Sequence, residues 1–206
     1  MAGNIDWSEL AQASPLLAAL PRPARAKSRR VELSGSAILF RRGDRPAAMY
    51  FVLSGEVRLA RYSKAGGEIV LQRARRGFLG EASLDQCAYH CDAVAAAQSR
   101  LLAIPLKALH DALAVPAFRK AWIGHLAREL RRARAQVERL SLKTARERII
   151  HFVETEGDNG SVELTQFKKD WAVELGLTHE ALYRALARME RLGLLAIDGA
   201  TVRHIR

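Results

Sequence analysis

The stretch LTQFKKDWAVELGLTHEALYRALARMERLGLL, residues 164–195, carries the most specific structural pattern of the sequence. Its apolar spacing predicts a helix over residues 166–175 with Thr165 as the N-cap, followed by a tight turn at Gly176-Leu177. The side chains expected to be buried on this helix are Phe167, Trp171, Ala172 and Leu175.

A second helix is expected to start at His179, with Thr178 as its N-cap, and to stop at Gly193. Its buried face comprises Leu182, Leu186 and Met189. Its first turns carry polar side chains that can reach base edges: His179, Glu180, Tyr183 and Arg184. Two short helices joined through a glycine turn form a helix-turn-helix, whose second helix enters the major groove of DNA. Residues 194–206 then alternate around Asp198-Gly199, which predicts a small hairpin wing.

A long amphipathic helix is predicted upstream of this motif, after a short helix over residues 106–113 and Pro116. Its apolar stripe consists of Phe118, Trp122, Leu126, Leu130, Ala133, Val137 and Leu140. Its other faces carry Arg128, Arg131, Arg132, Arg134 and Arg139. So long and narrow a stripe indicates a helix that pairs with its own copy about a two-fold axis. Packing of this helix on the chain's own β-domain is the alternative.

The N-terminal half of the sequence has the composition of a β-domain. Between residues 31 and 104, short β-rich runs are separated by glycines, which indicates an antiparallel sandwich or barrel. Before them, residues 5–20 predict a short amphipathic helix that ends before Pro21, and a basic stretch occupies residues 22–30. The expected fold class is therefore α+β.

Length and charge limit the kinds of protein that this can be. A chain of 206 residues is longer than one typical domain of about 100 to 150 residues, so two domains are expected. A net charge of +11, from 33 Lys and Arg against 22 Asp and Glu, favours a polyanionic partner. No apolar run approaches the roughly 18 to 20 residues of a membrane span, and the N-terminus lacks the layout of a signal peptide. A cytoplasmic location is expected.

Catalytic motifs are missing from the sequence. It has no phosphate-binding loop after a strand, no nucleophile elbow and no HExxH helix. The side chains of Glu81, Asp85, His90 and Asp92 do not form a recognisable acid and base pair. We therefore expect no enzymatic activity.

In the order of these parts, the chain resembles the cyclic-AMP receptor protein and fumarate-nitrate regulator (Crp/Fnr) family of bacterial transcription factors. Three segments carry the resemblance: GDRPAAMYFVLSGEVRL (residues 43–59) is similar to the family's β-roll signature, FLGE (78–81) to the start of its phosphate-binding cassette, and ELGLTHEALYRAL (174–186) to its recognition element. The resemblance implies a cyclic-nucleotide-binding-like β-roll effector domain over residues 1–113, a dimerisation helix over 114–141, and a winged helix-turn-helix DNA-binding domain over 142–206.

By this resemblance, Glu180 and Arg184 read a core of each DNA half-site that contains G-A. The residue types agree, because a carboxylate accepts from cytosine N4, an arginine donates to guanine O6 and N7, and residues i and i+4 share one helix face. His179 stands where the cyclic-AMP receptor has a further arginine. An ordinary exposed ion pair between Glu180 and Arg184 is the alternative. The other expected DNA-binding residues are Lys168, Lys169, Thr178, Tyr183, Arg188 and Arg203.

The resemblance also implies an effector pocket made of Gly80, Glu81, Cys91, Asp92, Ala133 and Arg134. Glu81 matches the family's ribose-binding glutamate, but Cys91 and Asp92 stand at the positions of its phosphate-binding arginine and serine. Ala133 and Arg134 stand at the positions that contact the base. A phosphate that faces an aspartate meets repulsion instead of a charge-assisted bond, so binding of cyclic AMP or cyclic GMP is not expected.

The segment CAYHC, residues 87–91, leaves other effectors open. Cys87, His90 and Cys91 could form a redox pair or a site for a soft metal or haem iron. Alternatively the cysteines fill a loop that packs on the β-roll, since two Cys and one His fall short of a four-ligand zinc site. A β-roll that binds no ligand, and a cyclic nucleotide held in an altered pocket, are further alternatives. No cofactor is assigned.

The sequence thus predicts a homodimeric, sequence-specific DNA-binding transcription regulator. Its site is expected to be an inverted repeat whose half-sites lie about one helical turn, ~34 Å, apart. Activation of transcription would require a surface that contacts RNA polymerase, which makes the polymerase a candidate partner. No membrane partner is expected.

Overall fold

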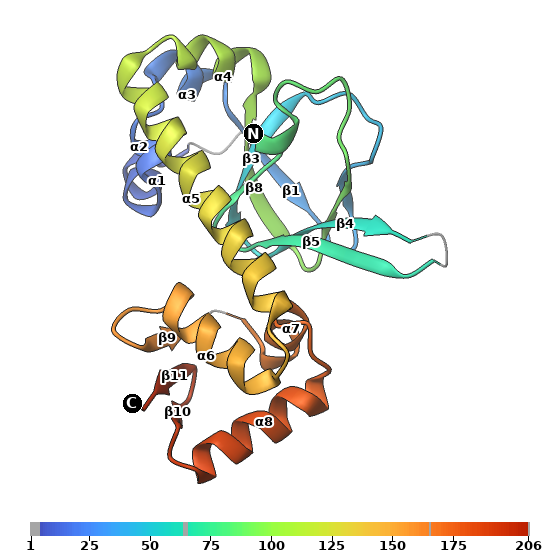
Figure 1. Ribbon diagram of the computed structural model, residues 1–206. Helices are drawn as coiled ribbons and strands as arrows, with labels where there is room; N and C mark the ends of the chain where they lie inside the picture. The colour runs from blue at the N-terminus through green and yellow to red at the C-terminus, as the bar shows by residue number, and fades with distance from the viewer. Residues whose placement is uncertain (1–4, 64–65, 165, 206) are drawn as a thin grey trace. The chain divides into compact units, whose positions relative to one another are not determined.

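A computed structural model describes residues 5–63, 66–164 and 166–205 of the chain (Figure 1). The chain divides into two compact units, Met1–His125 and Leu126–Arg206, and the boundary falls within the long helix α5 (Pro116–Ser141). The first unit contains antiparallel sheets and the second contains the two helices of the predicted helix-turn-helix. The α+β fold class is confirmed.

Two antiparallel sheets form the β-roll of the first unit. Its strands are β1 (Arg29–Leu33), β2 (Ile38–Phe40), β3 (Ala48–Ser54), β4 (Val57–Tyr62), β5 (Glu68–Ala74), β6 (Phe78–Leu79), β7 (Asp92–Ala95) and β8 (Ser99–Pro105). The strand order is β1-β8-β3-β6 in one sheet and β2-β7-β4-β5 in the other. Each pair of neighbours is antiparallel, as the short glycine-separated runs predict.

Strand β3 divides the hydrophobic core of the first unit, because successive side chains of a strand point to opposite faces of a sheet. Met49 and Phe51 belong to the cluster that also contains the helical residue Phe118. Tyr50 and Val52 belong to the cluster that contains residues of the second sheet. The sheet that includes β3 is therefore covered by helices on one face and by the other sheet on its opposite face.

Short helices flank the β-roll: α1 (Trp7–Ala13), α2 (Pro15–Ala18) and α3 (Arg22–Lys27) before it, and α4 (Leu106–Leu113) after it. Helix α4 has the predicted bounds. The single helix predicted over residues 5–20 is wrong, because Ser14 is extended and Pro15, which has no N–H to donate, starts a new helix. The basic stretch at residues 22–30 contains α3, which was not predicted.

The second unit contains α6 (Ala145–Glu156), α7 (Lys168–Glu174), α8 (His179–Arg191) and the strands β9 (Ser161–Glu163), β10 (Leu195–Asp198) and β11 (Thr201–His204). The hairpin predicted around Asp198-Gly199 is formed by β10 and β11. Strand β9, which is too short to give a sequence signal, adds to the hairpin in the order β10-β11-β9.

Helix α7 starts later than predicted, and one of its neighbours is exposed rather than buried. Phe167 is the N-cap residue in an extended conformation, so its side chain precedes the first helical turn and is 82% exposed. Trp171, Ala172 and Leu175 are buried, as predicted. The predicted cap, Thr165, lies outside the described residues.

Helix α5 confirms the predicted long helix, but its apolar stripe is buried only at the start. Phe118 and Trp122 pack in the core of the first unit. The stripe residues that are exposed are Leu126, Leu130, Ala133, Val137 and Leu140. Among the described residues, no helix combines the length and hydrophobicity that a membrane span requires.

Arg139 is buried, although the sequence pattern assigns it to a charged outer face of α5. Its side chain is 1% exposed and forms an ion pair with Glu156 at 3.0 Å. The same guanidinium donates to Thr155 Oγ1 at 3.1 Å and lies 4.7 Å from the centre of the Phe152 ring. These three partners belong to α6, so the correction follows from the packing of α6 against the end of α5.

Arg148 joins the end of α5 to the turn between α7 and α8. Its guanidinium donates to the carbonyl oxygens of Leu142, Leu175 and Gly176 at 3.0 Å each, and to that of Leu140 at 3.3 Å. Gly176 has a φ of 62°, a left-handed conformation that favours glycine at this turn. Backbone contacts therefore fix α8 relative to the end of α5.

Replacement of Arg148 by methionine should lower the free energy of unfolding by about 2 to 4 kcal/mol, because several carbonyl oxygens lose a charged donor. The matched control is Arg146→Met on the exposed surface of the same helix, which should change it by less than about 0.5 kcal/mol. Urea denaturation followed by tryptophan fluorescence measures both values, since Trp171 is buried in this unit. Equal effects of the two substitutions would contradict the role given to the guanidinium.

Candidate functional site

The start of α8 is fixed by its cap and by its buried face. Thr178 Oγ1 accepts a hydrogen bond from the N–H of Ala181 at 3.1 Å, as expected for an N-cap. Leu182, Leu186 and Met189 are buried, as predicted. At the other end, Gly193 has a φ of 68° and follows the helix as a stop signal. Local signals thus define both ends of the helix.

Glu180 and Arg184 are exposed, one turn apart, on the surface of α8 that faces away from its buried side chains. In the part of the chain that the structure describes, no ion pair joins these two side chains. Their polar groups are therefore open to an external partner. A carboxylate and a guanidinium one turn apart can together accept from one base and donate to another.

Tyr183 lies between two other residues of the predicted DNA-binding set. Its ring centroid is 4.5 Å from that of His179, and Lys168 Nζ lies 5.6 Å from the centre of the Tyr183 ring. A cation over an aromatic face is attracted by the ring quadrupole, so Lys168 restrains the tyrosine. Tyr183 remains 44% exposed. The structure thus brings α7 and α8 side chains into one polar surface.

The remaining members of the predicted DNA-binding set are exposed in the second unit. Lys169 is on α7, Arg188 on α8 and Arg203 on β11. Exposed cationic side chains near a recognition helix can bind phosphate oxygens without reading bases. Their contact with DNA stays a prediction.

Two residues of the predicted effector pocket, Gly80 and Glu81, follow β6. We call β6, Gly80 and the short helix η1 (Glu81–Ser83) the effector loop. Gly80 has a φ of 91°, a conformation that favours glycine. Glu81 Oε1 lies 3.8 Å from Nε2 of His125 on α5. His125 was not identified from the sequence. Its spacing of three residues from Trp122 could have indicated that it lies on the buried face of α5.

Asp92 and Cys91, which stand where a phosphate would be bound, have internal roles. Asp92 Oδ1 accepts a hydrogen bond from the N–H of Arg42 at 2.6 Å. Cys91 is 1% exposed, and burial raises the pKa of its thiol. Neither side chain supplies the positive charge that a phosphate needs. Ala133 and Arg134, the predicted base-contacting positions, are exposed residues of α5 in the second unit, and their role stays a prediction.

The two cysteines differ in exposure, since Cys87 is exposed and Cys91 is buried, and both are free thiols. His90 Nδ1 lies 3.4 Å from Ser83 Oγ. Within residues 5–63, 66–164 and 166–205, no three His, Cys, Asp or Glu side chains are placed to hold a metal ion. The redox, metal or haem alternative stays a prediction, with little support from this geometry.

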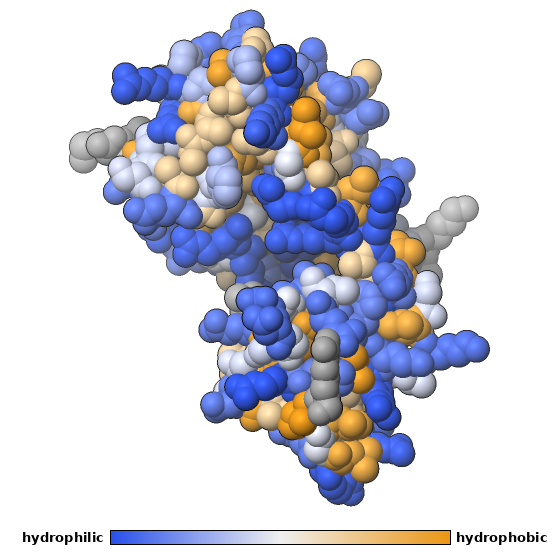
Figure 2. Space-filling model, turned by 60° about the vertical axis from the view of Figure 1, so that its left-hand side comes forward, coloured by the Kyte–Doolittle hydropathy of each residue, from blue (hydrophilic) through white to orange (hydrophobic). Residues whose placement is uncertain are grey.

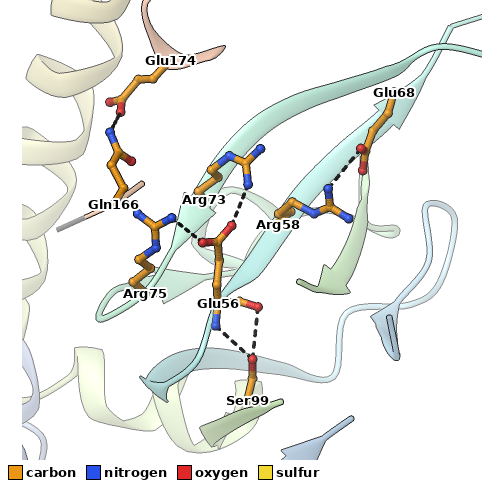
Figure 3. Close-up of polar contacts among 8 residues, drawn as sticks. All are labelled: Glu56, Arg58, Glu68, Arg73, Arg75, Ser99, Gln166 and Glu174. Carbon is orange, nitrogen blue, oxygen red and sulfur yellow. Dashed lines mark hydrogen bonds and ion pairs between the residues drawn. The ribbon is translucent and has the colours of Figure 1, made fainter. Parts of the chain in front are cut away.

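A buried carboxylate that the sequence did not indicate lies beside β4. Glu56 is 8% exposed and pairs with Arg73 at 2.7 Å and with Arg75 at 2.6 Å (Figure 3). Its backbone N–H donates to Ser99 Oγ at 3.0 Å. Because Ser99 starts β8 and Arg73 is on β5, these contacts join the two sheets. Glutamate is seldom buried, so sequence pattern alone does not reveal such a position.

Comparisons with known proteins agree with this architecture. Residues 30–115 match the family model described as the cyclic nucleotide-binding domain. The anaerobic regulatory protein of Haemophilus influenzae is 26% identical over 181 residues, which cover 83% of this chain and 70% of that protein.

Solved structures give the same result for the fold. The catabolite activator protein of Thermus thermophilus is 27% identical with a TM-score of 0.52, and the match covers 93% of this chain and 94% of that one. FixK2 from Bradyrhizobium japonicum has a TM-score of 0.66 at 23% identity, with 87% and 93% covered, and at that identity supports the fold alone.

Cys87 should react rapidly with Ellman's reagent in the folded chain, whereas Cys91 should react only after unfolding. The thiolate is the reactive species, and because the pKa of Cys91 is raised by burial, its thiolate forms only at a higher pH than that of an ordinary cysteine. Cys87→Ser is the control and should leave almost no reaction before denaturant is added. Rapid reaction of both thiols in the folded chain would instead favour a redox pair.

Proposed function

Because the chain belongs to the Crp/Fnr family of transcription regulators, we propose that it acts as a homodimer that binds an inverted-repeat DNA sequence and so regulates transcription. The observation that carries this proposal is the surface of α8, where Glu180 and Arg184 are exposed one turn apart on a capped helix. Members of this family are transcription regulators, which are not enzymes, and we propose no catalytic activity.

In the proposed complex, α8 lies in the major groove of each half-site. Arg184 donates to guanine O6 and N7, and Glu180 accepts from cytosine N4. His179 and Tyr183 border these two residues and contact neighbouring bases or phosphates. Thr178, Lys168, Lys169, Arg188 and Arg203 position the protein on the phosphate backbone.

Dimerisation is proposed to use the exposed stripe of α5. On the face of the molecule that Figure 2 shows, hydrophobic residues lie exposed among hydrophilic ones. On α5, the exposed fractions are 40% for Leu126, 52% for Leu130 and 68% for Val137. Apolar side chains that recur every three or four residues along one helix are best covered by a helix with the same stripe, and a second copy provides one.

The β-roll is proposed to act without cyclic AMP or cyclic GMP. Asp92 is already bonded to the N–H of Arg42, and Cys91 is a buried thiol, so the two positions offer a phosphate no positive charge. DNA binding in the cytoplasm therefore does not depend on these nucleotides. Where the protein activates transcription, RNA polymerase is the proposed partner.

Arg184→Ala should weaken binding to the selected DNA by about 1 to 3 kcal/mol and relax the base preference at one position of each half-site. Lys169→Ala is the control, because loss of a phosphate contact should weaken binding to all sequences alike. Selection from random duplexes, followed by fluorescence anisotropy at fixed salt with and without cyclic AMP, measures both effects. If the two variants lost affinity equally on every sequence, Arg184 would not read a base.

Selection that succeeds only with cyclic AMP would contradict the proposed nucleotide independence.

Leu130→Glu should convert the dimer to a monomer, because it places a carboxylate in the apolar stripe opposite its own copy. Arg128→Glu is the matched control, since Arg128 is an exposed residue of the same helix outside the stripe. Size-exclusion chromatography with light scattering gives the mass of each variant at several concentrations. A monomeric wild-type chain, or a dimer that survives Leu130→Glu, would exclude this interface.

A further inference from the structure

A buried contact between a carboxylate and an imidazole links the effector loop to α5 in the first unit. The side chains of Glu81 and His125 are 11% and 8% exposed, and Glu81 Oε1 lies 3.8 Å from His125 Nε2. Glu81 opens η1 directly after Gly80. His125 is the last residue of the first unit. The pair is therefore located at the point of α5 where this unit ends.

The pair is not completed by hydrogen bonds. Glu81 Oε2 and His125 Nε2 are buried and have no hydrogen-bond partner within the described part of the chain. The His125 ring packs against Phe78 and Trp122, with centroids 4.9 Å and 5.6 Å away, so its surroundings are largely apolar. A carboxylate in such surroundings needs a cation or a donor beside it. The imidazole of His125 is the group that lies beside this carboxylate.

We propose that His125 is an internal ligand of Glu81. Its imidazole supplies the polar partner that the buried carboxylate requires, and it holds the start of α5 on the β-roll in the form that binds DNA, without a small-molecule effector. This inference rests on the function proposed above, since DNA binding is one of its measurements.

The position of His125 explains how the pair acts on α5. Before it, Phe118 and Trp122 are buried in the first unit. After it, Leu126 and Leu130 are exposed and belong to the proposed dimer surface. Loss of the imidazole leaves the buried carboxylate of Glu81 without a polar partner. The carboxylate regains contact with water only if the loop or the start of the helix moves. Such a movement changes the first turns of α5.

The first test compares the DNA affinity of the wild-type chain with that of His125→Phe, Glu81→Gln and the double variant, with no effector added. Phenylalanine keeps the ring contacts to Phe78 and Trp122 but carries no charge. Each single variant should bind at least about tenfold more weakly, because a buried pair is broken. The double variant should match the weaker single variant within about twofold, because both changes remove the same interaction. Circular dichroism confirms that each variant is folded.

The second test is chemical rescue. His125→Ala leaves space beside Glu81 that free imidazole can enter. Calorimetry should detect imidazole binding to His125→Ala and none to Glu81→Gln/His125→Ala. Imidazole should also restore the DNA affinity of His125→Ala, whereas sodium chloride at the same ionic strength should not, since salt only weakens DNA binding.

Three outcomes would overturn the inference. The first is that His125→Phe binds DNA as tightly as the wild-type chain, and the second is that the losses of DNA affinity in the two single variants add up in the double variant. The third is that imidazole binds His125→Ala without restoring its DNA affinity. Failure of the proposed function is a different result, in which the wild-type chain itself selects no DNA sequence. A role of His125 in packing alone is also distinguished, because His125→Phe would then keep its affinity.

Discussion

The guanidinium of Arg148 is the contact on which the arrangement of the second unit depends. One side chain donates to carbonyl oxygens at the end of α5 and directly after it, and to the carbonyl oxygens of the turn between α7 and α8. Gln136 adds to this by donating from Nε2 to the carbonyl oxygen of Glu174 at 2.7 Å. The exposed face of α8 therefore keeps one direction relative to the end of α5. In a dimer built along α5, that direction sets the separation of the two α8 helices.

Three acidic side chains of the β-roll have partners inside the chain. Glu56 pairs with two arginines, Asp92 accepts from a backbone N–H, and Glu81 faces His125. A ligand that needs any of these carboxylates has to displace the partner that is already present, and the loss of that interaction reduces the net affinity. In the segment that resembles a nucleotide-binding cassette, Glu81 and Asp92 thus already have contacts within the β-roll itself.

The sequence predicts those parts of the molecule whose signals are local. Thr178 as a cap, Gly193 as a stop and the buried face of α8 can be read from adjacent residues, because capping and helical periodicity act within a few turns. Arg139 and Phe167 could not be placed correctly. The first is buried by α6, which lies elsewhere in the sequence, and the second depends on the residue at which α7 begins.

The residues of the candidate sites likewise include some that the sequence pattern identifies and some that it does not. Glu180 and Arg184 follow from the helical repeat once the helix-turn-helix is identified. The contact between Glu81 and His125 joins segments that are distant in the sequence, and neither residue type is distinctive. Asp92 stands at a predicted effector-pocket position that disfavours a phosphate, but its hydrogen bond from the N–H of Arg42 depends on how β7 lies next to the loop after β2. Tertiary contacts of this kind leave no periodic pattern.

The residues that hold α8 in position, at the turn around Gly176, are different from the residues on its exposed face. The left-handed backbone and the Arg148 contacts restrict residue 176 and favour glycine there. The exposed positions 179, 180, 183 and 184 make no contribution to that turn and carry no buried side chain. The chain can therefore exchange these four side chains by mutation while the scaffold stays intact, so the DNA target proposed for it can diverge between descendants, or be redesigned, without a new fold.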